Sequence, residues 1–124
     1  MEKIVLDTNI LIEVLKGNDA IVNKLETSEC RYCVSSITAM ELYYGALNKA
    51  ELYKLKKFIN LFELFDVNQN ISFIATELIF EYSKSHNLTI PDSLIAATAI
   101  HHNMQLHTLN VKDFVYIEEL SLYM

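Results

Sequence analysis

Three acidic residues stand at points where the chain is expected to change from one structural element to another. Asp7 ends the apolar run at residues 4–6, whereas Glu41 and Asp92 each have mostly apolar neighbours. Carboxylates that converge in one cleft repel one another, and a divalent cation relieves this repulsion. Acidic, oxygen-rich sites prefer Mg²⁺ or Mn²⁺ to softer ions. Read together, these acids predict a metal site.

Each acid also has a local structural explanation. Asp7 and the two residues after it can all cap a helix that follows the apolar run. Thr38 and Glu41 have the spacing of a capping box, and Thr89 and Asp92 imitate that spacing. Taken singly, the acids therefore leave helix capping and metal binding as open alternatives.

Short apolar segments alternate with segments of helical periodicity along the chain. The expected strands lie at residues 4–6, 32–36, 64–67, 105–108 and 115–117. The expected helices lie at residues 10–15, 19–25, 38–47, 51–62, 71–85 and 92–102. This alternation predicts an α/β fold, a three-layer sandwich with a mostly parallel, roughly five-stranded sheet covered by helices. Ligands of such sheets bind beyond the carboxyl ends of the strands, where Asp7 falls.

The composition indicates one compact domain spanning residues 1–124. The chain is 52% hydrophobic and contains two glycines and one proline. It has no apolar run of membrane-spanning length and no basic leader segment, so a cytoplasmic location is expected. The formal net charge of −6 argues against a simple nucleic-acid binder. It argues less against an enzyme in which metal neutralises clustered acids.

Cys30 and Cys33 form a single C-x-x-C pattern. A redox pair of this kind should open a helix, whereas these residues lead into an expected strand, where side chains three positions apart point to opposite faces. A zinc site would require further ligands that no second pair supplies. Free thiols are therefore expected.

Four segments resemble the motifs of the PIN-domain family, in particular its VapC-type toxin ribonucleases. The first two are IVLDTN at residues 4–9 and S-x-T-x-x-E-L at residues 36–42. The later two are PDSLIAA at residues 91–97 and TLNVKDF at residues 108–114. They occur in the family's order and cover essentially the whole chain. The resemblance implies a PIN-like fold and a metal-dependent endoribonuclease that hydrolyses RNA phosphodiesters.

The resemblance also assigns roles to individual residues. It implies that Asp7, Glu41 and Asp92 are catalytic and hold Mg²⁺ or Mn²⁺. Many relatives carry an acid where this chain has Asn110, and Asp113 follows shortly afterwards. Either residue can therefore supply the fourth position of the site, and Asp113 is counted among the catalytic candidates.

Three further polar residues are expected to support the carboxylates: Thr8, Asn9 and Ser93. Helix capping is an equal alternative for Thr8 and Asn9. Two other classes of protein are alternatives. A haloacid-dehalogenase-type phosphotransferase would need a second aspartate where this chain has Asn9. A catalytically inert PIN-like module that only binds protein is the third possibility.

Two kinds of protein partner are expected beside the RNA substrate. An uncontrolled ribonuclease would kill its cell, and the relatives that this chain resembles are held by a small antitoxin protein. A groove for an amphipathic antitoxin helix is predicted between two helices. Its predicted lining is Tyr43, Tyr44, Leu47, Leu52, Leu55 and Phe58, with Lys54, Lys56 and Lys57 at the rim.

A homodimer is the second expectation. Phe73 and Phe80 form an apolar stripe beside the core-facing stripe of their helix, and Tyr43 or Tyr44 adds to the candidate contacts. Burial of both phenylalanines in the monomer core is the alternative.

Overall fold

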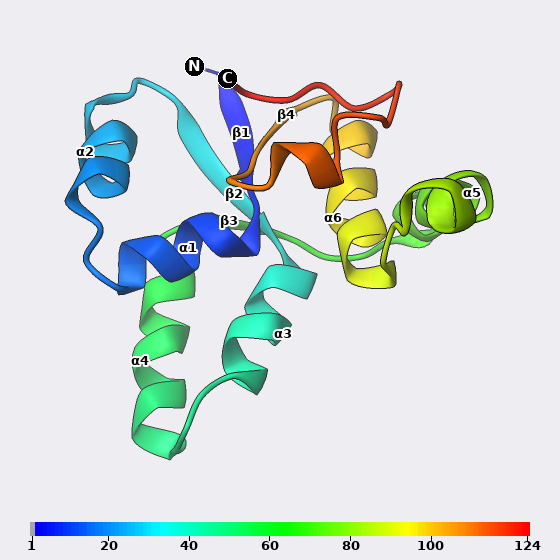
Figure 1. Cartoon of the computed structure of the whole chain (residues 1–124). Helices are drawn as coiled ribbons and strands as arrows, with labels where there is room; N and C mark the ends of the chain where they lie inside the picture. The colour runs from blue at the N-terminus through cyan, green and yellow to red at the C-terminus, as the bar shows by residue number, and fades with distance from the viewer. Residues whose placement is uncertain (1) are drawn as a thin grey trace.

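A four-stranded parallel sheet forms the centre of the computed structural model, which describes residues 2–124 (Figure 1). The strands are β1 (Lys3–Leu6), β2 (Arg31–Ser35), β3 (Glu63–Phe65) and β4 (Gln105–His107), in the order β3-β2-β1-β4. All pairings are parallel, so the carboxyl ends of the strands meet at one edge. The chain leaves β1 toward β2, while β4 adds on the other side of β1. In α/β proteins, such a reversal of strand order marks the binding crevice.

Helices cover both faces of the sheet, which confirms the predicted three-layer α/β architecture. They are α1 (Thr8–Leu15), α2 (Asp19–Thr27), α3 (Ser36–Tyr44), α4 (Lys49–Ile59), α5 (Gln69–His86), α6 (Ile90–His101) and the 3₁₀ helix η1 (Val111–Asp113). Each α-helix begins after a polar residue whose side chain accepts a hydrogen bond from a first-turn amide. The caps are Asp7, Asn18, Ser35, Asn48, Asn68 and Thr89.

Two apolar clusters form the core, one on each face of the sheet. Val5 and Leu6 are consecutive residues of β1, so their side chains point to opposite faces. Val5 packs with residues of α5, α6 and β4, whereas Leu6 packs with residues of α1, α3 and α4. Both side chains are fully buried, as expected for a strand with helices on both sides.

The prediction of a fifth strand at residues 115–117 is wrong. Backbone amides in this segment bond locally instead, from Val115 N to the Val111 carbonyl (2.9 Å) and from Ile117 N to the Phe114 carbonyl (3.0 Å). Phe114 and Ile117 are buried in the core, which explains the apolar pattern without a strand. Only one isolated parallel bridge within residues 2–124, between Leu106 and Leu122, adds to this edge of the sheet.

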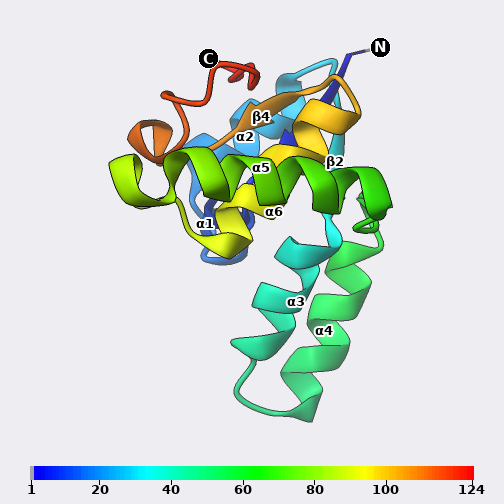
Figure 2. The ribbon, with the colours of Figure 1, turned by 90° about the vertical axis from the view of Figure 1, so that its right-hand side faces the viewer.

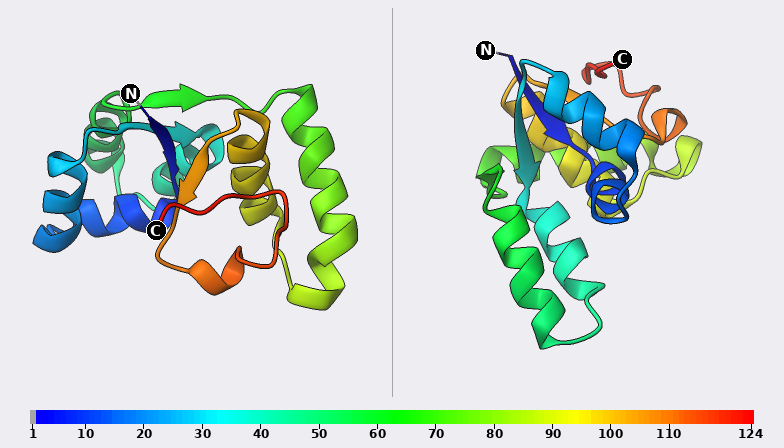
Figure 3. Two further views of the ribbon diagram at one scale, coloured as in Figure 1. Left: turned by 90° about the horizontal axis from the view of Figure 1, so that it is seen from above. Right: turned by 90° about the vertical axis from the view of Figure 1, so that its left-hand side faces the viewer.

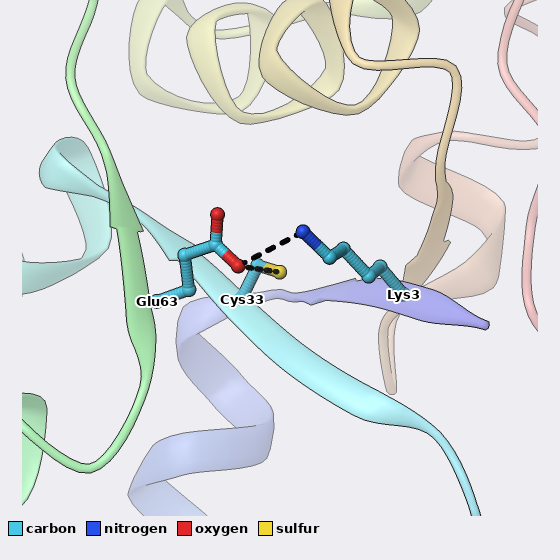
Figure 4. Close-up of polar contacts among 3 residues, drawn as sticks. All are labelled: Lys3, Cys33 and Glu63. Atoms are coloured by element: carbon cyan, nitrogen blue, oxygen red, sulfur yellow. Dashed lines mark hydrogen bonds and ion pairs between the residues drawn. The ribbon is translucent and has the colours of Figure 1, made fainter. Parts of the chain in front are cut away.

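Two cysteines are free, as expected, with Cys30 half-buried and Cys33 buried in β2. Figure 4 shows Cys33 between Lys3 of β1 and Glu63 of β3. Glu63 Oε1 lies 3.2 Å from Lys3 Nζ and 4.0 Å from Cys33 Sγ. Burial, followed by the charge of Glu63, raises the pKa of the Cys33 thiol. The Cys33 thiol is therefore a poor nucleophile, and it lies beside the ion pair between Lys3 and Glu63.

Helices α3 and α4 form a hairpin that projects away from the rest of the molecule (Figure 2). At another edge, α5 runs along the outer side of α6, as the view from above shows (Figure 3). The structure therefore offers two outer surfaces, the α3–α4 hairpin and the exposed side of α5. Among residues 2–124, no helix combines the length and the apolar character required to cross a bilayer.

Candidate acidic active site

Asp7 lies directly beyond the carboxyl end of β1 and is 5% exposed. Its Oδ1 accepts a hydrogen bond from Thr8 N (2.8 Å), so the capping role is present. Its Oδ2 accepts a hydrogen bond from Thr108 Oγ1 (2.8 Å), a residue beyond the end of β4. Its own backbone N–H donates to the His107 carbonyl (2.9 Å). The carboxylate is thus fixed in position by two strand ends, which a simple helix cap does not require.

The loop after β4 is organised around Thr108. Besides donating to Asp7, Thr108 Oγ1 accepts hydrogen bonds from Asn110 N (3.0 Å) and from Asn9 Nδ2 (3.4 Å). Asn9 Oδ1 also accepts from Leu109 N (3.3 Å). Asn9 therefore supports the carboxylate indirectly, by holding the loop that carries Thr108.

Glu41 reaches the same edge of the sheet from α3. Its Oε1 accepts a hydrogen bond from Thr8 Oγ1 (2.7 Å), which also lies 2.9 Å from Thr38 Oγ1. The capping box considered as the alternative role of Thr38 and Glu41 does not form, because Ser35 caps α3 by accepting from the backbone N–H of Ile37 (3.1 Å). The hydrogen bond from Thr8 directs the Glu41 side chain toward α1.

Asp92 lies in the first turn of α6, beyond Pro91, and is half-buried. Its backbone N–H donates to Thr89 Oγ1 (3.3 Å), so α6 begins at Ile90, earlier than expected. Burial raises the pKa of the Asp92 carboxyl to about 6, and the charges of Asp7, Asp113 and Glu41 contribute in that order. The same two causes, with burial first and the neighbouring acids Glu41 and Asp113 among the contributors, raise the pKa of Asp7.

The fourth position of the predicted site lies in η1. Asn110 caps this short helix without a side-chain hydrogen bond, and Asp113 occupies its last position. Both residues are exposed. Asp113 contributes to the raised pKa values of Asp7 and Asp92. We therefore place Asp113 with the other acids and assign Asn110 to the geometry of the loop.

The four acids share one region but do not form a closed set of metal ligands. Within residues 2–124, no three His, Cys, Asp or Glu side chains lie close enough together to hold one metal ion. The ion pairs of this part of the chain join Lys3 to Glu63 and Lys16 to Glu13, so no lysine or arginine neutralises the four acids. Carboxylate oxygens in a half-buried, uncompensated acidic region suit a hard divalent cation, which would draw them together.

The Ser93 hydroxyl, which was expected to support the carboxylates, donates its hydrogen bond to the backbone instead. This hydroxyl is buried and donates to the Ile90 carbonyl (2.6 Å) inside the first turn of α6. The sequence suggested only a capping role for Thr38 and no role for Thr108, although these hydroxyls contact Thr8 and Asp7. Their positions within the second and fourth motifs were the available signal.

A parallel α/β sheet that gathers carboxylates beyond the carboxyl ends of its strands defines the class of fold, and sequence comparison identifies the family. The model of the PIN domain family matches residues 4–118. The chain therefore belongs to the PIN domain family. This assignment does not favour the haloacid-dehalogenase alternative or an inert module.

Relatives within this family carry VapC names. The chain is 31% identical over 121 residues to Ribonuclease VapC10 of Mycobacterium tuberculosis, covering 95% of this chain and 90% of the relative. It is 34% identical over 125 residues to Ribonuclease VapC2 of Rickettsia felis, covering 94% and 93% respectively.

Solved structures show the same likeness. VapBC2 from Rickettsia felis, bound to a DNA fragment from its promoter, superposes with a TM-score of 0.82 at 32% identity and covers 98% of this chain and 97% of that one. A toxin–antitoxin complex from Klebsiella pneumoniae gives a TM-score of 0.79 at 31% identity, with coverage of 94% and 93%. The chain therefore resembles VapC toxins over nearly its full length.

Proposed function

We propose that this protein is a metal-dependent endoribonuclease of the VapC type, the toxin of a toxin–antitoxin pair. The observation that carries the proposal is the buried Asp7 carboxylate, held between the ends of β1 and β4 in a region shared with Asp92 and Glu41. The ribonuclease names of relatives that are more than 30% identical support the same function. We expect residues 1–124 to act as one nuclease domain in the cytoplasm.

The chemistry that this site suits is hydrolysis of an RNA phosphodiester. Asp7, Glu41 and Asp92 would hold Mg²⁺ or Mn²⁺, which lowers the pKa of a bound water and stabilises the charge on a leaving oxygen. Thr108 and Thr8 N orient Asp7, while the Thr8 hydroxyl orients Glu41. Asp113 adds negative charge at the open side of the region.

Cleavage of RNA by the purified protein tests the proposal. With total RNA and Mg²⁺ or Mn²⁺, the wild type should produce discrete fragments that carry 5′-phosphate ends. Asp7→Asn and Asp92→Asn should abolish cleavage because each removes a ligand and its charge. The exposed α2 residue Glu26 provides the matched control, since Glu26→Gln also removes one negative charge but lies outside the site. Wild-type cleavage by either aspartate variant at saturating metal would refute the site assignment.

Asp113→Ala should lower cleavage less than Asp92→Ala at matched stability. Asp113 is exposed in a short helix, whereas Asp92 is half-buried and its pKa responds to all three other acids. Equal losses would show that Asp113 is a full metal ligand. Turnover of small phosphate esters without RNA cleavage would instead favour a phosphatase.

The proposed antitoxin partner fits the surface of the α3–α4 hairpin. One groove of about 310 Å³ is lined by Tyr43, Lys49, Leu52, Tyr53 and Lys56. A second groove of similar volume lies between α1, α3 and α4 and includes Glu41. An amphipathic helix in the first groove would meet two lysines, and a basic side chain entering the second would reach an acid of the site. The antitoxin could therefore bind and inhibit through neighbouring surfaces.

Of the six residues predicted to line this groove, Tyr43 and Leu52 do so, whereas Tyr44, Leu47, Leu55 and Phe58 do not. Lys56 is the one predicted rim lysine that lines it. Leu55 is buried in the core, and Phe58 is half-buried and packs edge-on against Phe62 at a centroid distance of 5.3 Å. Both face inward because they continue the core stripe of α4. Tyr53 takes their place in the groove.

The proposed homodimer uses the exposed side of α5. Phe73 and Phe80 are 65% and 88% exposed, so their burial in the monomer core is excluded. Tyr44 is 95% exposed, whereas Tyr43 is half-buried in the groove wall. Exposed aromatic residues of this size favour a protein contact.

A further inference from the structure

An aromatic stack joins the end of α5 to the segment after η1. The rings of His86 and Tyr116 are stacked, with centroids 4.1 Å apart and planes inclined by 8°. Tyr82 packs edge-on against Tyr116 at 5.1 Å. Ser85 Oγ lies 2.8 Å from His86 Nδ1 and fixes the orientation of the imidazole ring. Tyr82 packs edge-on against His86 at 5.8 Å, and His86 is exposed.

This stack lies beside the acidic region. His86 is the last residue of α5, and Asp92 follows in the first turn of α6. Tyr116 follows the helix η1, which ends at Asp113. Two views agree that the C-terminal end of α5 lies next to η1 (Figures 2 and 3). Burial raises the pKa of Tyr116, and the next contributions come from Asp92 and Asp113, which places the ring within electrostatic range of both acids.

Residues on either side of Tyr116 anchor the chain after η1 to the core. Phe114 and Ile117 are buried on either side of Tyr116 and hold this segment against the core. Backbone hydrogen bonds from Val115 N and Ile117 N fix its turns. The His86 imidazole is exposed and stacked on the anchored Tyr116 ring, and it is thus available for a ligand.

We propose that the His86–Tyr116 stack is a platform on which one unpaired base of the RNA substrate stacks beside the cleavage site. The inference rests on the proposed ribonuclease function and adds a base-binding subsite to it. Proteins that hold single-stranded RNA commonly stack its bases on aromatic side chains, including histidine. Such stacking tolerates different bases, because every base has a π-face. Lys112, exposed on η1 beside Asp113, is positioned to meet a neighbouring phosphate.

Abasic substitution in the RNA combined with substitution in the protein tests this platform. The probe is a short single-stranded RNA spanning a cut site mapped in total RNA, together with derivatives that lack one base at a time. For the wild type, removal of the stacked base should lower kcat/KM by ~10-fold, which is the size of effect that loss of a base–aromatic stack produces. His86→Ala should lower kcat/KM for the intact RNA by a similar factor and should remove the effect of that abasic position.

Two further variants separate base stacking from a structural role. His86→Phe keeps a stacking ring and should restore both the rate and the sensitivity to the abasic position. His101→Ala removes a half-buried histidine from the opposite end of α6, where it contacts Asn68, and should behave as the wild type. If every abasic RNA lost activity equally with the wild type and with His86→Ala, the platform would be refuted. Absence of wild-type cleavage would instead refute the proposed function itself.

Discussion

Asp92 links the acidic site to the pH dependence of stability. Its carboxyl has a pKa of about 6 in the folded protein instead of 3.8, because burial and neighbouring acids disfavour the charge. Between these values the folded protein binds more protons than the unfolded chain, so the free energy of unfolding falls as pH rises. This contribution is complete below 3.8 and is lost as pH rises through about 6. Asp92→Asn should show a smaller fall, measured by chemical denaturation across this range.

Metal binding should offset the loss of stability that the charged Asp92 carboxylate causes at high pH. At a pH above 6, Mg²⁺ or Mn²⁺ should raise the unfolding midpoint of the wild type, because an ion bound to the folded state stabilises it. The metal-induced shift of the midpoint should be much smaller for Asp92→Asn than for the wild type, and Glu26→Gln should show the wild-type shift. Equal shifts in all three proteins would show that the ions bind elsewhere.

The sequence was informative about acids and less informative about the hydroxyls that hold them. Asp7, Glu41 and Asp92 could be selected because each stands at an element boundary in apolar surroundings. The contact from Thr108 to Asp7 joins residues 101 positions apart, and no local pattern reports such a pairing. Glu41 had a local capping explanation, which failed because Ser35 already satisfies the start of α3.

The α3–α4 hairpin carries the prediction about the antitoxin. Tyr53→Glu should weaken antitoxin binding by at least ~10-fold, because it places a charge in an apolar groove wall, and should leave RNA cleavage unchanged. Leu61→Glu introduces the same charge at an exposed residue that does not line this groove and serves as the control. Titration with the small protein copurified from the native source measures the affinity.

Expression in a naive bacterial host provides the complementary test. The wild type should arrest growth, and Asp7→Asn should not. If the wild type arrested growth no more than Asp7→Asn, and no small partner copurified from the native source, the toxin proposal would fall. A housekeeping nuclease or an inert module would then remain.

At the level of elements, the long periodic segments and four of the five short apolar strands were predicted correctly, and the segment at residues 115–117 was not. The helix expected at residues 71–85 is present as α5, because its apolar stripe repeats over several turns. The segment at residues 115–117 has the composition of a strand but is too short to distinguish a strand from a turn whose apolar residues enter the core. Tertiary contact, not local preference, decides such segments.

At the scale of the whole molecule, the exposed side chains of Phe73 and Phe80 on α5 carry the prediction about the homodimer. Phe73→Lys together with Phe80→Lys should convert a dimer to a monomer in sedimentation analysis, because the charges would be buried in the interface. Leu61→Lys changes another exposed apolar residue, outside α5, and should leave the dimer intact. A wild-type mass that is monomeric at every concentration would refute the dimer.

The hydrogen bond between Thr108 and Asp7 spans 101 residues and therefore has a consequence for synthesis. A ribosome releases the amino-terminal part of a chain first and keeps the most recent part within its exit tunnel. Asp7 emerges early, whereas Thr108, which follows β4 and bonds to Asp7, emerges 101 residues later. The acidic centre cannot be completed while the chain is still short.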